Sequence, residues 1–164
     1  VLPALYAGHE VAAHTCTHPS LYKLSDEALA VAAENARRLG ARVTLRRADA
    51  LTDLAERFPE RFDLIVSNPP YVPESDRGAM HPNVRDYEPA LALFVPDDDP
   101  LRFYRAIAQA GRRMLRPGGS LWFEIYEHAA AQMAAMLETE GYAATEIYRD
   151  LFDKERMTCS RLER

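Results

Sequence analysis

The chain has 164 residues and a formal net charge of −5 at neutral pH, with 48% hydrophobic and 27% charged residues. This length and composition are typical of one folded domain with a hydrophobic core, and they exclude a disordered chain. The negative charge argues against a nucleic-acid-binding surface, which is usually basic. The apolar runs are too short to span a bilayer. We therefore expect neither nucleic acid nor a membrane to be a direct partner.

The two cysteines, Cys16 and Cys159, form neither a CxxC pair nor a disulfide framework. This usage is typical of proteins in a reducing compartment, so we expect a cytoplasmic location. The chain begins with Val1 rather than methionine, and for that reason we expect a fragment or a shortened form of a longer protein.

The first predicted helix covers residues 26–39. Ser25 is suited to cap it, because a hydroxyl oxygen can accept a hydrogen bond from a free backbone N–H group. Apolar residues then recur at the spacing of one helix face, and Gly40 follows as a residue that ends helices. After this helix we expect a strand at residues 42–47 and a helical turn within residues 51–58.

A buried strand is predicted at residues 62–67, where the run FDLIV has β-branched residues near its centre. The Pro-rich segment 72–98 that follows is too long for a plain connector, which favours a functional loop. A second long helix is expected from residue 99 to residue 115, with Asp99 as its cap and Pro100 in its first turn.

The last part of the chain returns to alternating strand and helix patterns after the helix-breaking residues 117–119. The predicted elements are a strand at 120–126, a helix at 128–140 and strands at 142–149 and 155–162. We expect Trp122 and Phe123 in the core. The short turn at 150–154 predicts that the last two strands form an antiparallel pair.

This alternation of strands and helices predicts an α/β fold, with a sheet that has helices on both faces. Ligands of such sheets bind beyond the carboxyl ends of the strands. Asn68 follows one predicted strand and Asp49 follows another, so both are candidate site residues.

The stretch SNPPY, residues 67–71, directly follows the apolar run FDLIV at residues 62–66. Pro69 and Pro70 cannot donate to a β-ladder, so they end the strand and stiffen the turn. A stiff turn fixes the Asn68 side chain and the Pro69 carbonyl, which together can hold both hydrogens of a planar NH2 group. The Tyr71 ring can stack on that group. These features favour chemistry at an amide or amino nitrogen, although Asn and Pro also end strands in plain turns.

NPPY after an apolar strand resembles the signature of methyltransferases that modify amino or amide nitrogens with S-adenosylmethionine. Four further stretches narrow the resemblance: NVRDYEPALAL (83–93), DPLRFYRAI (99–107), LRPGGSLWFEI (115–125) and RDLFDKERMTCSRL (149–162). In this order and spacing they are similar to the peptide chain release factor glutamine N5-methyltransferases. The resemblance covers roughly residues 25–164. It implies a Rossmann-like S-adenosylmethionine-dependent methyltransferase sheet with a C-terminal antiparallel strand pair.

The resemblance further implies that Asn68 and Pro69 bind the glutamine side-chain amide, and that Pro70 and Tyr71 shape the same pocket. The implied reaction is an in-line transfer of methyl from a sulfonium to the amide nitrogen, without a metal or a covalent enzyme intermediate. Proximity and orientation would supply most of the rate. The implied partner is a peptide chain release factor with a Gly-Gly-Gln loop, which connects the chain to translation termination.

For the cofactor S-adenosylmethionine, the resemblance implies three contacts. Asn68 would lie beside the methyl donor, Asp49 near the adenine, and Ala50 in the lining of the adenine pocket. Asp49 also fits a plain helix cap or turn, and both interpretations stay open.

Residues 1–24 depart from this family. The family has a glycine-rich D-x-G-x-G-x-G loop after its first strand, where the backbone approaches the cofactor closely. It also has an acidic residue that holds the ribose. Gly8 is the only glycine before Gly40, and Lys23 stands about where the acidic residue belongs. We therefore expect impaired cofactor binding, with the N-terminal part of the fold truncated or replaced.

Residues 8–24, GHEVAAHTCTHPSLYKL, resemble a different family, the polysaccharide deacetylases of the chitin-deacetylase type. His14 and His18 match the two metal-binding histidines of that family's H-[ST]-x-x-H-P motif. A catalytic zinc site needs about three protein ligands, and the family's acidic pair has no counterpart here. We therefore expect no functional metal site. We divide the chain into an atypical segment, 1–24, and a methyltransferase domain, 25–164, that is incomplete at its N-terminus.

Two other functions remain as alternatives to the glutamine methyltransferase. One is a metal-dependent polysaccharide deacetylase fragment that uses His14 and His18. The other is a non-enzymatic remnant that binds a glutamine-bearing peptide without any cofactor.

Overall fold

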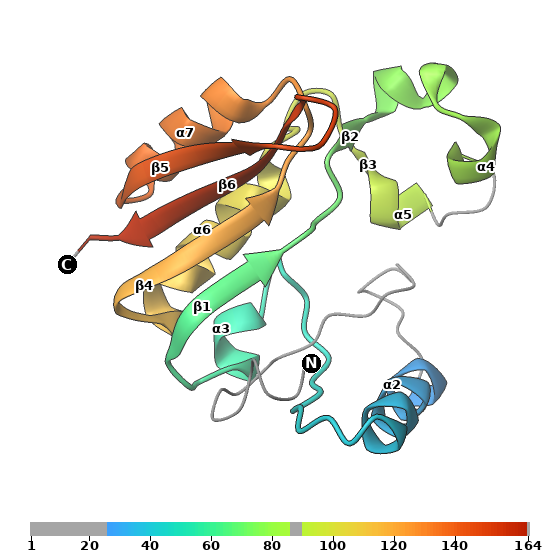
Figure 1. Ribbon diagram of the computed structural model, residues 1–164, viewed down its shortest axis with the longest axis vertical. Helices are drawn as coiled ribbons and strands as arrows, with labels where there is room; N and C mark the ends of the chain where they lie inside the picture. The colour runs from blue at the N-terminus through green and yellow to red at the C-terminus, as the bar shows by residue number, and fades with distance from the viewer. Residues whose placement is uncertain (1–25, 86–89, 164) are drawn as a thin grey trace.

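A four-stranded mixed sheet forms the centre of the molecule (Figure 1). The computed structural model describes residues 26–85 and 90–163. The strands are β1 (Phe62–Ser67), β4 (Leu115–Glu124), β5 (Tyr142–Arg149) and β6 (Glu155–Leu162). Their spatial order is β1-β4-β6-β5, with β1 parallel to β4 and β6 antiparallel to both of its neighbours. The predicted antiparallel pair near the C-terminus is therefore confirmed.

One face of this sheet packs against α6 (Arg102–Met114) and α7 (Ala130–Thr139). The apolar sides of both helices meet alternate residues of the strands, because successive strand residues point to opposite faces. The largest fully buried side chains of this core are Tyr104, Leu115, Leu121, Phe123, Ile125, Met133 and Leu137. None of the helices in the described part of the chain is both long and apolar enough to cross a bilayer.

The opposite face of the sheet carries apolar side chains that the described residues leave uncovered. Leu64 and Val66 of β1 are 49% and 67% exposed. Trp122 lies opposite Val66 in the β1–β4 register and stacks on Tyr148 of β5, with 5.2 Å between the ring centroids. The prediction that β1 is buried is thus wrong for this face. Trp122 lies on this face as well, outside the core that holds Phe123.

In the N-terminal part of the described chain, the predicted helices are present but the predicted strand is not. Helix α2 (Asp26–Arg38) and the short helix α3 (Leu54–Arg57) lie within the predicted helical segments. Ser25, the predicted cap of α2, lies outside the described residues. The predicted strand at 42–47 is wrong, because those residues contain only an isolated bridge at Val43. A strand needs a partner for its backbone hydrogen bonds, and in the described sheet β1 is an edge strand paired with β4.

Helix α6 begins two residues later than the sequence predicts. Leu101 occupies the cap position, without a side-chain hydrogen bond to the helix. The Asp99 carboxylate, which the prediction assigned to the cap, instead accepts two hydrogen bonds of 3.1 Å from the Arg105 guanidinium. The ion pair with a later turn of α6 therefore replaces the expected cap.

Strand β4 begins at Leu115 rather than at residue 120. The register jumps from Phe62 opposite Leu115 to Leu64 opposite Ser120, so residues 117–119 form an irregularity within the paired strand. Gly118 has a φ of +79°, a backbone conformation that glycine adopts readily. The Pro-Gly-Gly sequence therefore bends the strand, where we expected it to separate the helix from the strand.

The described parts of segment 72–98 fold into short elements rather than an irregular loop. They are β2 (Val72–Pro73), the 3-10 helix η2 (Glu74–Ala79), α4 (Pro82–Arg85), α5 (Ala90–Leu93) and β3 (Phe94–Val95). β2 pairs in parallel with β3, and Phe94 and Val95 are buried. Figure 1 shows these elements beyond the carboxyl end of β1, where ligands of α/β sheets bind.

Candidate functional site

The SNPPY stretch forms the turn that leaves β1, called here the 68–71 turn. Asn68 is exposed, Pro69 and Pro70 are buried, and Tyr71 is half-buried. The prolines end the β1 ladder because they have no N–H group, and their burial anchors the turn to the body of the protein. Asn68 therefore presents a polar amide to solvent from a fixed piece of backbone.

Tyr71 is held by a carboxylate at the end of the neighbouring strand. Its phenol donates a hydrogen bond of 2.8 Å to Oε1 of Glu124, the last residue of β4. Burial raises the pKa of the Tyr71 phenol well above its usual range, and the Glu124 carboxylate acts in the same direction. The Arg156 guanidinium of β6 acts in the opposite direction on this pKa. Tyr71 is therefore a neutral phenol with a fixed orientation.

Two more tyrosines surround this contact. The Tyr104 phenol of α6 donates to the backbone carbonyl of Glu124 at 2.9 Å, and burial raises the pKa of Tyr104. The Tyr126 phenol donates to Oδ2 of Asp76 in η2 at 2.6 Å, which raises the pKa of Tyr126 to about 12. The rings of Tyr71 and Tyr126 lie 6.3 Å apart. The end of β4 thus joins α6, η2 and the 68–71 turn through phenol hydrogen bonds.

The short elements after the turn pack back on it. The backbone N–H of Tyr71 donates to the Leu93 carbonyl at 3.2 Å. The Ser75 N–H donates to Oδ1 of Asp97 at 3.0 Å, and the Arg77 guanidinium lies 4.8 Å from the centre of the Phe94 ring. These contacts connect both ends of segment 72–98 next to Tyr71.

The predicted cofactor residue Asp49 begins a separate, local turn. Its Oδ1 accepts a hydrogen bond of 2.8 Å from Leu51 N–H, and its own N–H donates to Oδ1 of Asp53 at 2.6 Å. The turn interpretation of Asp49 therefore matches these contacts, and the carboxylate is half-buried. Ala50 packs against the edge of the core. The cofactor roles of Asp49 and Ala50 stay predictions.

Among residues 26–85 and 90–163, no group of three or more His, Cys, Asp and Glu side chains could hold a metal ion. His14 and His18 lie outside the described residues.

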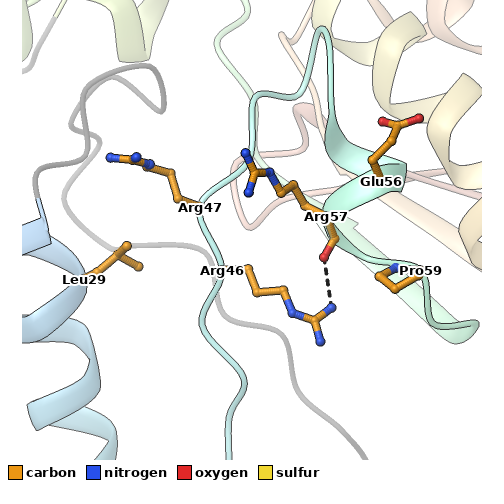
Figure 2. A pocket seen from close by; sticks show the side chains of 6 residues that line it. All are labelled: Leu29, Arg46, Arg47, Glu56, Arg57 and Pro59. Carbon is orange, nitrogen blue, oxygen red and sulfur yellow. Dashed lines mark hydrogen bonds between the residues drawn. The ribbon is translucent and has the colours of Figure 1, made fainter.

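A cavity of about 560 Å³ opens near α3, away from the 68–71 turn. Figure 2 shows its lining: Leu29, Arg46, Arg47, Glu56, Arg57 and Pro59. Arg46 donates to the Arg57 carbonyl at 3.0 Å and forms a two-pronged ion pair with Glu60. Arg46 lowers the pKa of Glu60 to about 2. None of the residues that the sequence assigned to substrate or cofactor lines this cavity, so we place the candidate site at the 68–71 turn instead.

Sequence reasoning missed Glu124 and Arg156 as neighbours of Tyr71. Glu124 could have been identified as a site residue from the sequence, because it is a carboxylate at the carboxyl end of a predicted strand, where ligands bind. Arg156 could not have been identified in this way, because its position beside Tyr71 depends on the pairing of β6 with β4.

The chain is similar to curated bacterial proteins that are each named release factor glutamine methyltransferase. It is 48% identical over 136 residues to the protein of Bacteroides thetaiotaomicron, which corresponds to 83% of this chain and 49% of that protein. It is 42% identical over 154 residues to the protein of Cereibacter sphaeroides, which corresponds to 93% of this chain and 54% of that protein. The chain thus spans about half the length of the relatives it matches. No family model matches the chain.

Solved methyltransferases share the fold. A methyltransferase from Pyrococcus furiosus superposes with a TM-score of 0.59 at 15% identity, over 87% of this chain and 61% of that one. A ribosomal protein L11 methylase from Lactobacillus delbrueckii subsp. bulgaricus gives a TM-score of 0.52 at 17% identity, over 86% and 56% of the two chains. The predicted Rossmann-like methyltransferase fold is therefore confirmed.

The resemblance of residues 8–24 to polysaccharide deacetylases is not borne out. The relatives and structures named above are methyltransferases or methylases. The match to the Cereibacter sphaeroides protein covers 93% of the chain. Residues 1–24 make up a larger fraction of the chain than the part this match leaves uncovered, so the match must include some of them. Over most of its length, this chain is a homologue of the release factor glutamine methyltransferases.

Proposed function

We propose that this chain forms part of a methyltransferase that modifies the side-chain amide nitrogen of a glutamine in a peptide chain release factor, with S-adenosylmethionine as methyl donor. One observation carries the proposal. An exposed Asn68 stands beside a hydrogen-bonded Tyr71, in a chain that is 48% identical to a protein named release factor glutamine methyltransferase.

The 68–71 turn supplies the groups that a glutamine amide needs. The side-chain carbonyl of Asn68 and the backbone carbonyl of Pro69 accept hydrogen bonds from the two N–H groups of the glutamine. Pro70 supports the turn, and the Tyr71 ring forms a wall of the pocket. Holding both N–H groups aims the nitrogen lone pair and stabilises the positive charge that it gains during attack. With S-adenosylmethionine bound, the nitrogen held in this way would accept the methyl group from the sulfonium and would release a proton to solvent.

The residues available for the cofactor are Asn68, Asp49 and Ala50. Their chemistry fits a polar nucleoside, because they offer an exposed amide, a half-buried carboxylate and a small apolar side chain. When bound, S-adenosylmethionine supplies an electrophilic methyl group on a sulfonium. We propose that Asn68 faces this methyl group and that Asp49 and Ala50 contact the adenine.

The same proposal includes the domain division and the cellular setting. Residues 25–164 form the methyltransferase domain, and residues 1–24 form the segment without the glycine-rich loop. The partner is the glutamine-bearing loop of a release factor, and the reaction belongs to translation termination in the cytoplasm.

Calorimetric titration of S-adenosylmethionine into the 164-residue chain tests the cofactor part of this proposal. A transfer assay with a bacterial release factor and isotope-labelled methyl donor then tests the reaction. We expect measurable binding and a label that appears on a glutamine of the release factor. Binding without transfer to glutamine would contradict the proposed substrate. No binding at millimolar cofactor would contradict the proposed reaction for this chain.

A further inference from the structure

Two large apolar side chains project from the β5–β6 hairpin. Leu151 and Phe152, called here the 151–152 tip, are 101% and 83% exposed. These are the highest values among the large hydrophobic residues of the described chain. Exposed apolar side chains at this position do not stabilise the fold, because such side chains contribute to stability only when they are buried.

The turn that carries the tip is held in one shape by hydrogen bonds. Oδ1 of Asp150 accepts from the N–H groups of Phe152 and Lys154 at 2.8 and 3.1 Å. The Asp150 N–H donates to the Lys154 carbonyl at 2.9 Å, and Arg149 donates to the Asp153 carbonyl at 2.7 Å. These backbone hydrogen bonds lower the pKa of Asp150. The exposure of the tip is therefore a property of an ordered turn.

The tip is connected to the candidate site through Arg156. The Arg156 guanidinium donates to Oδ2 of Asp150 at 3.3 Å, and it lies close enough to the Tyr71 phenol to lower its pKa. The Arg156 carbonyl accepts from Ile125 N–H, the residue after Glu124, at 2.8 Å. Because β6 is antiparallel to β4, the hairpin turn lies at the carboxyl end of β4, at the same end of the sheet as β2 in Figure 1.

The charged groups around the tip are already paired. Lys154 contacts Glu127 at 2.5 Å, and Arg149 contacts Glu155 at 3.0 Å. A partner would therefore meet the tip through apolar area rather than through an unpaired charge at these positions. This chemistry fits the surface of a folded protein better than it fits a small polar cofactor.

We propose that the 151–152 tip is a docking contact for the protein substrate. It would pack against an apolar patch on the release factor, next to the glutamine that enters the 68–71 turn. This inference rests on the proposed function, and it adds a contact outside the catalytic turn that recognises the intact protein rather than the glutamine.

The test compares the double variant Leu151→Ser/Phe152→Ser with a matched control, Val31→Ser/Leu39→Ser, in the 164-residue chain. Val31 and Leu39 are also exposed, at 61% and 77%, but they lie on and just after α2. Affinity is measured by calorimetry for the intact release factor and for a short peptide that contains the accepting glutamine. We expect the tip variant to bind the release factor about tenfold more weakly, because a few residues carry most of the binding energy of such contacts. Peptide affinity and the control variant should be unchanged.

Each other outcome is informative. Equal affinity of the tip variant and the unaltered chain for the release factor would overturn the docking role and leave the proposed function intact. No binding of the release factor by the unaltered chain would overturn the proposed function, and this inference with it. A concentration-dependent dimer that disappears in the tip variant would assign the tip to self-association and overturn the docking role.

Discussion

The two turns that carry the candidate site residues are built in different ways. The turn at residues 49–53 is local, since Asp49 bonds to Leu51 and Asp53 within the turn itself. The 68–71 turn depends on Tyr71 and Glu124, which are 53 positions apart in the sequence. The contacts of the first turn need only neighbouring residues, whereas the Tyr71–Glu124 contact of the second needs β1 and β4 to lie side by side. The substrate side of the proposed site is therefore sensitive to the whole fold.

Asn68→Ala should have the largest effect. If Asn68 holds the glutamine amide, its loss removes a hydrogen bond to the reacting nitrogen and should lower kcat for methyl transfer by about 100-fold. Because Asn68 is exposed, the free energy of unfolding should change little. Single-turnover transfer and urea unfolding measure the two quantities. Equal rates in both proteins would contradict the role of Asn68.

Glu124→Ala should have the next largest effect, on stability. The change leaves the half-buried Tyr71 phenol without its acceptor, at a cost of about 1–3 kcal/mol in the free energy of unfolding. A double-mutant cycle with Tyr71→Phe isolates the contact, because Tyr71→Phe removes the donor. Additive effects of the two changes would show that the hydrogen bond contributes nothing to stability.

Asp49→Ala should cost less, about 1 kcal/mol, as expected for a side chain that accepts a single local backbone hydrogen bond. The same variant separates the two interpretations of Asp49. A cofactor contact predicts weaker binding of S-adenosylmethionine by calorimetry, whereas a purely structural turn predicts unchanged affinity. Asp53→Ala is the matched control, because Asp53 belongs to the same turn and has no predicted cofactor role.

The smallest expected effect is on alkaline stability near the 68–71 turn. The hydrogen bond to Asp76 raises the pKa of Tyr126 from about 10 to about 12, and burial adds to the shift. A raised pKa means that the phenol stabilises the fold below pH 10 and that this contribution disappears as the pH rises through 12. Phenolate absorbance during titration should show several late tyrosines, and Tyr126→Phe should remove the one that ionises near pH 12. Asp76→Asn should move that transition toward lower pH.

The sequence predicted the elements whose signals lie within a few residues. The apolar spacing before Gly40 fixes helix α2, and the short segment 150–154 fixes the β5–β6 hairpin. The prolines of SNPPY end β1 as predicted, because they have no N–H group for the ladder. The Asp99 cap was wrong because Arg105 in the following helix competes for the same carboxylate.

The amino-acid sequence by itself thus determined the methyltransferase fold class and the end of β1 before the prolines of the 68–71 turn. Only the tertiary structure decided that Glu124 and Arg156 surround the Tyr71 phenol and that Leu64 and Val66 are on an uncovered face. The physical reason is the separation along the chain over which each kind of interaction acts. Helix spacing and turn chemistry act between neighbouring residues, whereas the partners of a side chain across a sheet depend on strand order and register, which no single segment contains.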